Sequence, residues 1–226
     1  MFRFLPNRRQ EASYKFAEVG FHGDKYLLAL VDDIVTRESI EWFIETGTNV
    51  GSTLIYFAKR HPHIQAISCE QDLEACRRAR EHARGLTNVE IQQLASRDFL
   101  KLLAKRTGLF EKRCLFWLDA HGYGFEWPLK DEVRFIAENF PSAYIMIDDF
   151  KVPELDCFSY DEYRGQVCSY DYIRESFGSR PHQVFGPRYT DRTSEHHPLV
   201  GWGLIVLGAD YTLPAVLQDR VGRTEK

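Results

Sequence analysis

The sequence predicts an α/β fold in which helices cover both faces of a doubly wound, mostly parallel seven-stranded sheet. Two observations carry this prediction. Short apolar segments alternate with segments of helical periodicity from residue 24 to residue 150, which is typical of strand–helix–strand units. Two later apolar segments, 183–185 and 202–207, are joined by a polar loop and favour an antiparallel C-terminal strand pair at the sheet edge.

The individual elements follow from local patterns. Asp24 is placed to cap a first helix, Gly85 is a typical helix stop, and Pro128 stands where a first helical residue belongs. Helices are expected from residue 24, at 52–60, 72–84 and 98–106, and from residue 128. Parallel strands are expected at 41–45, 64–70, 89–93, 114–118 and 144–147.

Bulk composition narrows the class of protein. A length of 226 residues suits one α/β domain, and a formal net charge of -4 gives no sign of a basic nucleic-acid-binding domain. No apolar run reaches the roughly 20 residues that span a bilayer. The first ten residues lack a signal-peptide core, and the five cysteines form no CxxC pair. We therefore expect a cytoplasmic protein with reduced thiols and with neither a membrane nor a nucleic-acid partner; a homo-oligomer stays open.

A nine-residue segment after the first predicted strand carries the clearest functional signal. It reads Glu45-Thr46-Gly47-Thr48-Asn49-Val50-Gly51-Ser52-Thr53, an E-x-G-x-x-x-G pattern. In an open α/β sheet, ligands bind beyond the carboxyl ends of the strands, and this turn is the usual place. Glycine permits a tight turn and close approach of a ligand, and the next helix points free N–H groups at the pocket. A turn that merely needs glycine is the alternative.

The glycine spacing and a downstream acid decide which cofactor the loop suits. A dinucleotide fingerprint needs a second and third glycine where Asn49 and Ser52 stand. Glu70 ends the second predicted strand, where an acidic side chain accepts hydrogen bonds from ribose hydroxyls. The loop resembles that of class I S-adenosylmethionine (AdoMet) methyltransferases, which have a Rossmann-like fold. Together with Glu70 it predicts AdoMet as the cofactor.

The resemblance implies further contacts with the cofactor. In such methyltransferases the loop after the third strand holds the adenine, and many carry an acid where this chain has Ala95, so Ser96 is expected to make a polar contact there. Glu45 supports the loop and the methionine amino group in the family; structural hydrogen bonds to the turn are its alternative. The predicted cofactor-binding residues are Glu45, Gly47, Thr48, Asn49, Gly51, Ser52, Thr53, Glu70, Ser96 and Asp119.

Three carboxylates follow the fourth and fifth predicted strands. Asp119 ends one strand, and Asp148 and Asp149 end its neighbour, so the three should converge beside the methyl-donor site. Bunched carboxylates repel one another, and a cation, a shared proton or a hydrogen-bond donor usually compensates. Oxygen ligands of this kind suit Mg²⁺ or Mn²⁺. Capping of the next turn and direct contact with the cofactor amine or substrate hydroxyls are the alternatives.

The acids also extend the resemblance over roughly residues 41–153. The chain is similar to small-molecule O-methyltransferases of the catechol and macrolide-sugar types, in which acids at these strand ends hold a metal that grips two substrate oxygens. It is also similar to a looser group of bacterial methyltransferases and hydroxylase-like relatives. The matching segments are Asp119-Ala120-His121, Pro128-Leu129-Lys130-Asp131-Glu132 and Asp148-Asp149-Phe150.

Among the histidines, His121 is the best candidate for a general base. Its ordinary pKa lies near neutrality, so the neutral form is available to take a hydroxyl proton. Metal ligation and a hydrogen bond to Asp119 are its alternatives. The predicted catalytic residues are therefore His121, Asp119 and Asp148. His22, His61, His63, His82 and His182 carry no local signal.

These signals together predict an AdoMet-dependent O-methyltransferase acting on a small-molecule hydroxyl, with or without a divalent metal. An N-methyltransferase or hydroxylase-like relative, and a non-catalytic AdoMet-binding protein, are the alternatives. Within one domain, 1–226, we expect an N-terminal helical segment at 1–40 and a cofactor-binding core at 41–150. A substrate-covering segment with the C-terminal strands is expected at 151–226.

Overall fold

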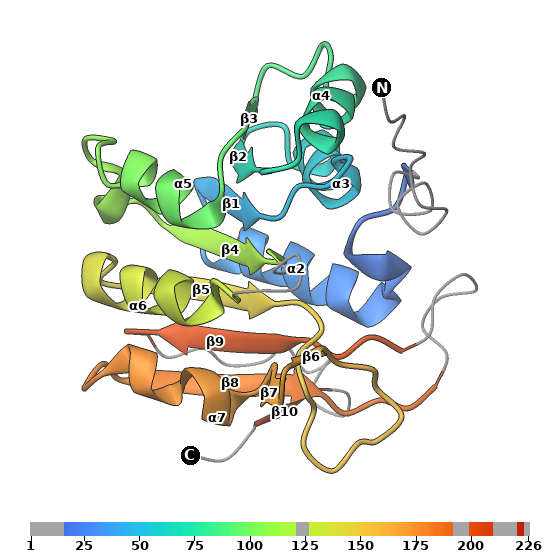
Figure 1. Cartoon of the computed structure of the whole chain (residues 1–226), viewed down its shortest axis with the longest axis vertical. Coiled ribbons are helices and arrows are strands. Elements are labelled where there is room, and N and C mark those ends of the chain that lie inside the picture. The colour runs from blue at the N-terminus through green and yellow to red at the C-terminus, as the bar shows by residue number, and fades with distance from the viewer. Residues whose placement is uncertain (1–15, 121–126, 192–198, 210–220, 224–226) are drawn as a thin grey trace, which may run out of the picture.

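The computed structural model describes residues 16–120, 127–191 and 199–209 and the backbone of 221–223 (Figure 1). The strands are β1 Trp42–Thr46, β2 Gln65–Cys69, β3 Val89–Gln92, β4 Cys114–Leu118, β5 Ala143–Ile147, β6 Glu162–Tyr163, β7 Gln166–Val167, β8 His182–Pro187, β9 Gly203–Leu207 and β10 Val221–Arg223. The α-helices are α2 Lys25–Arg37, α3 Ser52–Arg60, α4 Leu73–His82, α5 Ser96–Leu103, α6 Leu129–Asn139 and α7 Tyr170–Ile173. Short 3₁₀ turns are η1 Phe21–Gly23, η2 Leu109–Glu111 and η3 Arg174–Phe177.

The main sheet has the strand order β10-β8-β9-β5-β4-β1-β2-β3. Strands β1 to β5 pair in parallel, and β9 is antiparallel to both β5 and β8. The chain therefore starts in the middle of the sheet and winds outward in both directions, as the alternation of strands and helices predicts. The predicted doubly wound, mostly parallel sheet and its antiparallel C-terminal pair are confirmed. A short additional strand, β10, pairs with β8 at the edge and extends the seven predicted strands to eight.

Helices lie on both faces of the sheet and create two apolar layers (Figure 1). Helices α2, α3 and α4 pack on one face, where Leu30 and Leu54 are fully buried. Helices α5 and α6 pack on the other face, where Phe99 and Ile136 are fully buried. Because β4 and β5 are buried on both sides, every residue in them is inaccessible. This explains why their sequences are continuously apolar rather than alternating.

The helix boundaries agree with the local signals, with small shifts. The side chain of Asp24 accepts hydrogen bonds from the backbone N–H groups of Tyr26 and Leu27, at 2.9 and 3.1 Å, and so caps α2 as predicted. Helix α5 begins at Ser96 rather than at residue 98. Pro128 is the cap residue of α6 and immediately precedes its first turn.

The segment that contains Tyr189 and Trp202 contacts the start of α2. The weak periodicity of that C-terminal segment does not predict this contact. The hydroxyl of Tyr189 donates to the Asp24 carboxylate and accepts a hydrogen bond from Trp202 Nε1 at 2.9 Å. The rings of Tyr26 and Tyr189 lie 4.4 Å apart. One buried carboxylate thus both caps the first helix and holds the distant strand region against it.

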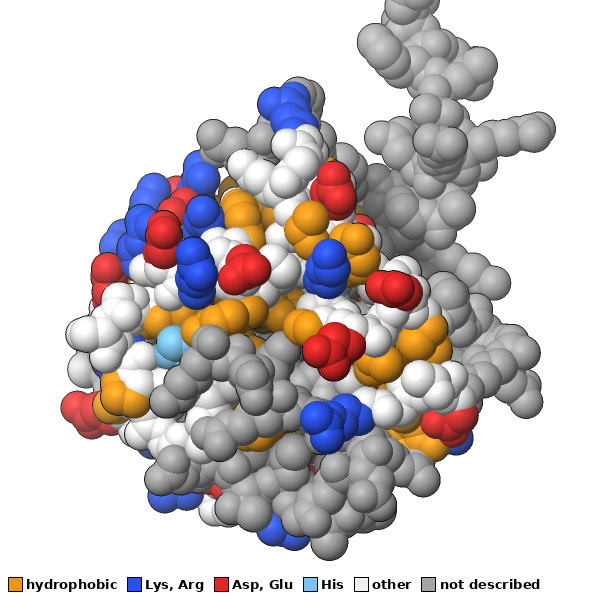
Figure 2. Space-filling model, turned by 90° about the horizontal axis from the view of Figure 1, so that it is seen from below, with side chains coloured by type: hydrophobic (Ala, Val, Ile, Leu, Met, Phe, Trp, Pro, Cys, Tyr) orange, Lys and Arg blue, Asp and Glu red, His pale blue; other side chains and the backbone are white. Residues whose placement is uncertain are grey.

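The exposed surface mixes both signs of charge. On the face seen from below, acidic, basic and hydrophobic side chains are interspersed among the coloured atoms, which indicates no large single-sign patch on that face (Figure 2). Within the described part of the chain, no helix is both long enough and apolar enough to cross a membrane.

An ion pair between α2 and the end of α3 should make stability depend on acid pH. Asp32 accepts hydrogen bonds from Arg60 Nε at 2.7 and 2.9 Å, and His61 Nε2 lies 3.1 Å away. Burial raises the pKa of Asp32, but His61 and Arg60 outweigh it and lower the pKa to about 2. The carboxylate therefore stabilises the fold above its ordinary pKa of 3.8, and this stabilisation is lost as pH falls through about 2.

Asp32→Asn is thus expected to reduce the free energy of unfolding by about 1–2 kcal/mol at neutral pH. The difference in unfolding free energy between this variant and wild type should vanish as the pH falls to about 2. Chemical denaturation between neutral and acid pH measures it. Asp33→Asn is the control, because Asp33 pairs with Arg37 on the same helix surface at 2.7 Å and should change stability little. A constant difference at all pH values would contradict this account.

Candidate active site

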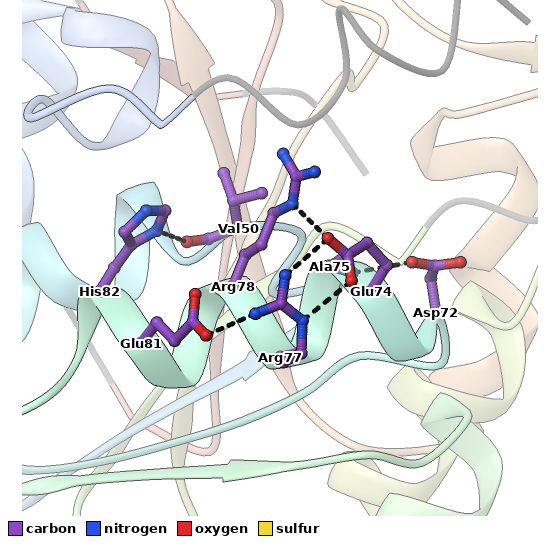
Figure 3. A network of polar contacts seen from close by, with 8 residues as sticks. All are labelled: Val50, Asp72, Glu74, Ala75, Arg77, Arg78, Glu81 and His82. Carbon is purple, nitrogen blue, oxygen red and sulfur yellow. Dashed lines mark hydrogen bonds and ion pairs between the residues drawn. The ribbon is translucent and has the colours of Figure 1, made fainter. Parts of the chain in front are cut away.

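The loop between β1 and α3 wraps around the end of β2. The backbone N–H groups of Gly47 and Thr48 both donate to the carbonyl of Cys69, each at 3.0 Å, and Gly51 N donates to the Thr48 carbonyl at 2.8 Å. Helix α4 holds the same loop from outside, because His82 Nδ1 lies 2.9 Å from the Val50 carbonyl (Figure 3). The predicted loop is therefore a closed turn anchored to two neighbouring elements.

Gly47 is required by the end of β4. Its φ is +84°, and a Cβ built there would lie 2.2 Å from the carbonyl oxygen of Asp119. Gly51 has φ +89°, and its Cβ would lie 2.9 Å from Ile55 Cδ1 in the next helix. Both glycines are thus explained by backbone conformation and close packing. Close approach of a ligand, the other reason that the pattern suggests, stays a prediction.

Glu70 lies at the end of β2 and joins the loop to the next helix. Its Oε2 accepts from Asn49 N at 2.7 Å, and its Oε1 accepts from Asp72 N at 2.8 Å. Asn49 adopts a left-handed conformation, with φ 49°, that turns its N–H toward this carboxylate. Burial raises the pKa of Glu70, opposed by these two amide hydrogen bonds. Each oxygen still has a second lone pair, so the carboxylate can also accept from ribose hydroxyls.

Glu45 belongs to a buried polar chain under the loop. Ser68 Oγ donates to Glu45 Oε2 at 2.6 Å, and the hydroxyls of Ser68 and Thr48 are hydrogen-bonded to each other. Burial raises the pKa of Glu45 well above its ordinary value, against the Ser68 hydrogen bond. Pattern reasoning missed Ser68, although Glu45 and Ser68 are direct neighbours across β1 and β2 once the strands are paired in register. This supports the structural alternative for Glu45.

Three further predicted cofactor contacts, Ser52, Thr53 and Ser96, also bond within the protein. Ser52 Oγ accepts from Ala17 N at 3.0 Å, and Thr53 Oγ1 accepts from Phe21 N at 3.3 Å. These two hydroxyls therefore hold the N-terminal segment against the start of α3. Their role toward the cofactor stays a prediction.

Ser96 is the third of these residues. It is buried at the first position of α5, and its hydroxyl donates to the buried carboxylate of Glu132 in α6. The bond joins two helices on the same face of the sheet. A polar contact between Ser96 and the adenine stays a prediction that nothing in the geometry supports or excludes.

The three acids lie at the carboxyl ends of the two neighbouring strands, as predicted. Asp119 N donates to the Thr46 carbonyl at 3.0 Å, and Asp148 N donates to the Leu118 carbonyl at 3.1 Å, so both backbones continue the sheet ladder. Asp149 turns away from the strand with φ 49°. The strand ends therefore do bring these carboxylates to one edge of the sheet.

The residue that meets these acids is one that pattern reasoning passed over. His22 Nε2 lies 2.9 Å from Oδ1 and 2.7 Å from Oδ2 of Asp148, although 126 positions separate the two residues in the chain. The only local signal for His22 is its place in the short Gly20-Phe21-His22-Gly23 turn before the cap residue Asp24.

The charge state of His22 follows from these neighbours. Burial lowers its pKa, but the charge and hydrogen bond of Asp148 raise it more strongly. The charges of Asp119 and Asp149 add to this effect, and the pKa reaches about 9. At neutral pH the imidazole is therefore a cation bound to a buried carboxylate.

The predicted metal site is not seen among the residues that the structure describes. In the ranges 16–120, 127–191 and 199–209, no group of three or more His, Cys, Asp or Glu side chains is arranged to hold a metal ion. Both oxygens of Asp148 face His22 Nε2, so that carboxylate already has a cationic partner. Metal ligation by Asp119, Asp148 and Asp149 stays a prediction. His121 lies outside the described residues.

Aromatic side chains near the strand ends divide between core and surface. Phe150, Phe158 and Trp127 are buried in the apolar layers, whereas Tyr160 is exposed. The ring of Trp127 stacks on that of Tyr172 at 5.2 Å and meets Tyr163 edge-on at 5.5 Å. The described aromatic residues therefore mainly stabilise the segment that follows β5.

Comparison with known proteins supports the fold. No protein-family model matches the sequence, and no curated protein matches it. A crystal structure from Klebsiella pneumoniae described as an O-methyltransferase is 17% identical with a TM-score of 0.56, covering 88% of this chain and 86% of that chain. The O-methyltransferase TomG from Streptomyces achromogenes, in complex with AdoMet, is 17% identical with a TM-score of 0.53, covering 81% and 78%.

An O-methyltransferase from Bacillus cereus, in complex with S-adenosylhomocysteine, is 16% identical with a TM-score of 0.53, covering 88% of this chain and 86% of that chain. At such identities the likeness concerns the arrangement of the backbone. The chain has the fold of class I AdoMet-dependent methyltransferases.

Proposed function

We propose that this protein is a methyltransferase that uses AdoMet to methylate a hydroxyl group of a small molecule. The observation that carries the proposal is the contact between Glu70 and the Asn49 amide at 2.7 Å. It places a buried carboxylate directly beside the β1–α3 loop, and β1 borders the point where the strand order reverses, between β1 and β4. A carboxylate in that position suits a ribose, and the N-terminal end of α3 suits the carboxylate of an amino acid.

The residues of the chain divide the work of such a reaction by position. Glu70 would bind the ribose, and the closed loop from Gly47 to Gly51 would hold the rest of the cofactor at the sheet edge. AdoMet, when bound, would supply a methyl group on a sulfonium: the acceptor oxygen would bond to the methyl carbon as the C–S bond breaks and S-adenosylhomocysteine leaves. The hydroxyl proton would pass to a base, the role predicted for His121. The protein aligns the two reactants and excludes water. Asp119 and Asp148, at the adjacent strand ends, lie where the acceptor would be positioned.

The acceptor class is inferred from the named neighbours and from the acids. Structures similar in fold are described as O-methyltransferases, and one of them is described as involved in tomaymycin synthesis. Carboxylates at the ends of β4 and β5 can accept hydrogen bonds from acceptor hydroxyls. A small polyhydroxylated molecule is therefore the acceptor that we propose.

Calorimetric titration with AdoMet and with S-adenosylhomocysteine tests the proposal. Both should bind, with dissociation constants on the order of micromolar, or about -8 kcal/mol. NAD⁺ is the control and should give no heat of binding, because the loop lacks the third glycine of a dinucleotide site. Absence of heat with both sulfur compounds would refute the proposed function.

A further inference from the structure

The residues before α2 cross the candidate site as a strap, which we define as residues 16–23. The strap is fixed to the first turn of α3 by the bonds from Ala17 N to Ser52 Oγ and from Phe21 N to Thr53 Oγ1. Gly20 packs so closely there that an added Cβ would lie 3.1 Å from Thr53 Cα and from the Tyr56 side chain. The strap therefore runs from the cofactor loop toward the acids in a defined position.

The end of the strap is held in an unfavourable backbone conformation. Phe21, His22 and Gly23 all have positive φ, at 51, 54 and 68°. Two of these are not glycine, and such strain persists only where the surroundings impose it. Phe21 is buried, with its ring 4.8 Å from that of Trp117 and 6.3 Å from that of Phe43. Burial of this ring on one side and the capped start of α2 on the other direct His22 to the acids.

A single nitrogen of His22 contacts both carboxylate oxygens of Asp148, within hydrogen-bond distance of each. The Asp148 side chain is 2% exposed, whereas the His22 side chain is 31% exposed. The imidazole thus covers the carboxylate and presents its other edge outward. A divalent ion bound to these two oxygens would compete with His22 Nε2 for them.

We propose that His22 takes the place that a divalent metal ion would occupy at the acids, so that the site binds its acceptor beside a His22–Asp148 pair without Mg²⁺ or Mn²⁺. The location of the acceptor in this statement rests on the proposed function; the exclusion of metal by His22 does not. Because it acts through Asp148, His22 is a positioning residue. The strap then has a role beyond packing, since it brings the His22 imidazole onto both oxygens of the Asp148 carboxylate.

The experiment measures Mn²⁺ binding by electron paramagnetic resonance, using the full chain. Wild type should leave the signal of free Mn²⁺ unchanged, and Mg²⁺ or chelator should leave its melting temperature unchanged. His22→Ala uncovers the carboxylate and should acquire Mn²⁺ binding, which the double variant His22→Ala/Asp148→Asn should lose again. His22→Lys restores a positive charge and should again exclude Mn²⁺.

His63→Ala is the matched control, because it removes an exposed histidine outside the site and should behave as wild type. Circular dichroism verifies that each variant is folded. If His22→Ala is not, His22→Asn, which tolerates the positive φ of position 22, replaces it and should likewise acquire Mn²⁺ binding. Mn²⁺ binding by wild type, or no gain of binding in a folded His22→Ala, would overturn the proposal. Binding of S-adenosylhomocysteine is measured on the same samples. If S-adenosylhomocysteine does not bind to wild type, the proposed function is refuted. The proposal for His22 is then still decided by the Mn²⁺ measurements alone.

Discussion

Gly47→Ala is expected to lower the melting temperature by roughly 10 °C or to prevent folding, because the new methyl group has no space. A Cβ at this position would lie 2.2 Å from the Asp119 carbonyl oxygen, 2.6 Å from its carbonyl carbon and 2.9 Å from Ala120 N. These are backbone atoms at the end of β4, the strand that pairs with β1 through its whole length. The clash can be relieved only by separating the two central strands of the sheet.

The backbone conformation adds to this clash. With φ +84°, position 47 is in a region that residues with a side chain rarely adopt, and adopting it costs about 1–3 kcal/mol. Overpacking against backbone atoms adds about 1–3 kcal/mol. Together these terms are a large part of the stability of an ordinary domain. Thermal denaturation followed by circular dichroism measures the effect.

Gly85→Ala is the matched control for the clash. Gly85 also has a positive φ, +91°, but nothing lies within 4 Å of the position that a Cβ would take. This variant therefore carries the conformational penalty alone and should melt a few degrees below wild type, about 2–4 °C per kcal/mol. If both variants lost the same amount of stability, the contact with Asp119 would not be what selects glycine at position 47.

Glu70→Ala is expected to weaken binding of S-adenosylhomocysteine about 10–100-fold, the effect of losing hydrogen bonds to a charged group. The variant removes the proposed acceptor for the ribose and also frees the Asn49 N–H that this carboxylate holds in the loop. Glu70→Gln should fall between Ala and wild type. A glutamine keeps one acceptor oxygen, but its amide nitrogen cannot accept from either Asn49 or Asp72. Calorimetric titration measures the dissociation constants.

Glu74→Gln is the control for this second prediction. Glu74 is an acid of the same segment, four residues along, whose carboxylate pairs with Arg77 and Arg78 on the exposed side of α4 (Figure 3). These contacts join residues of α4 to one another and include no residue of the loop, so ligand affinity should stay within about twofold of wild type. Unchanged affinity in a folded Glu70→Ala would remove the observation on which the proposed function depends.

The sequence predicts the sheet well because its signals are local. Strands β4 and β5 are continuously apolar, and Asp24 has the side chain that a helix start needs. Burial of a strand on both faces requires apolar residues along that strand, and unsatisfied N–H groups at a helix start require a capping side chain there. Both requirements concern only a few consecutive residues, so both can be recognised in the sequence. The positions of Asp119 and Asp148 at strand ends follow directly from the same patterns.

The partners of the site residues depend on segments that meet only after folding. Glu45 needs Ser68 from the next strand, and Ser96 is paired with Glu132 in another helix. In each case the sequence indicates a polar residue near the carboxyl ends of the strands, where ligands bind. Only the register of β1 with β2, or the packing of α5 on α6, determines which group it contacts.

The acids at the ends of β4 and β5 show most clearly which features depend on sequence and which depend on tertiary structure. The sequence by itself determined that carboxylates gather there and that something must balance their charge. The tertiary structure decided that His22 contacts Asp148, from 126 positions away and through a turn of three residues with positive φ. No periodicity encodes such a contact, because it depends on where the packing of Phe21 and the start of α2 leave the histidine in space.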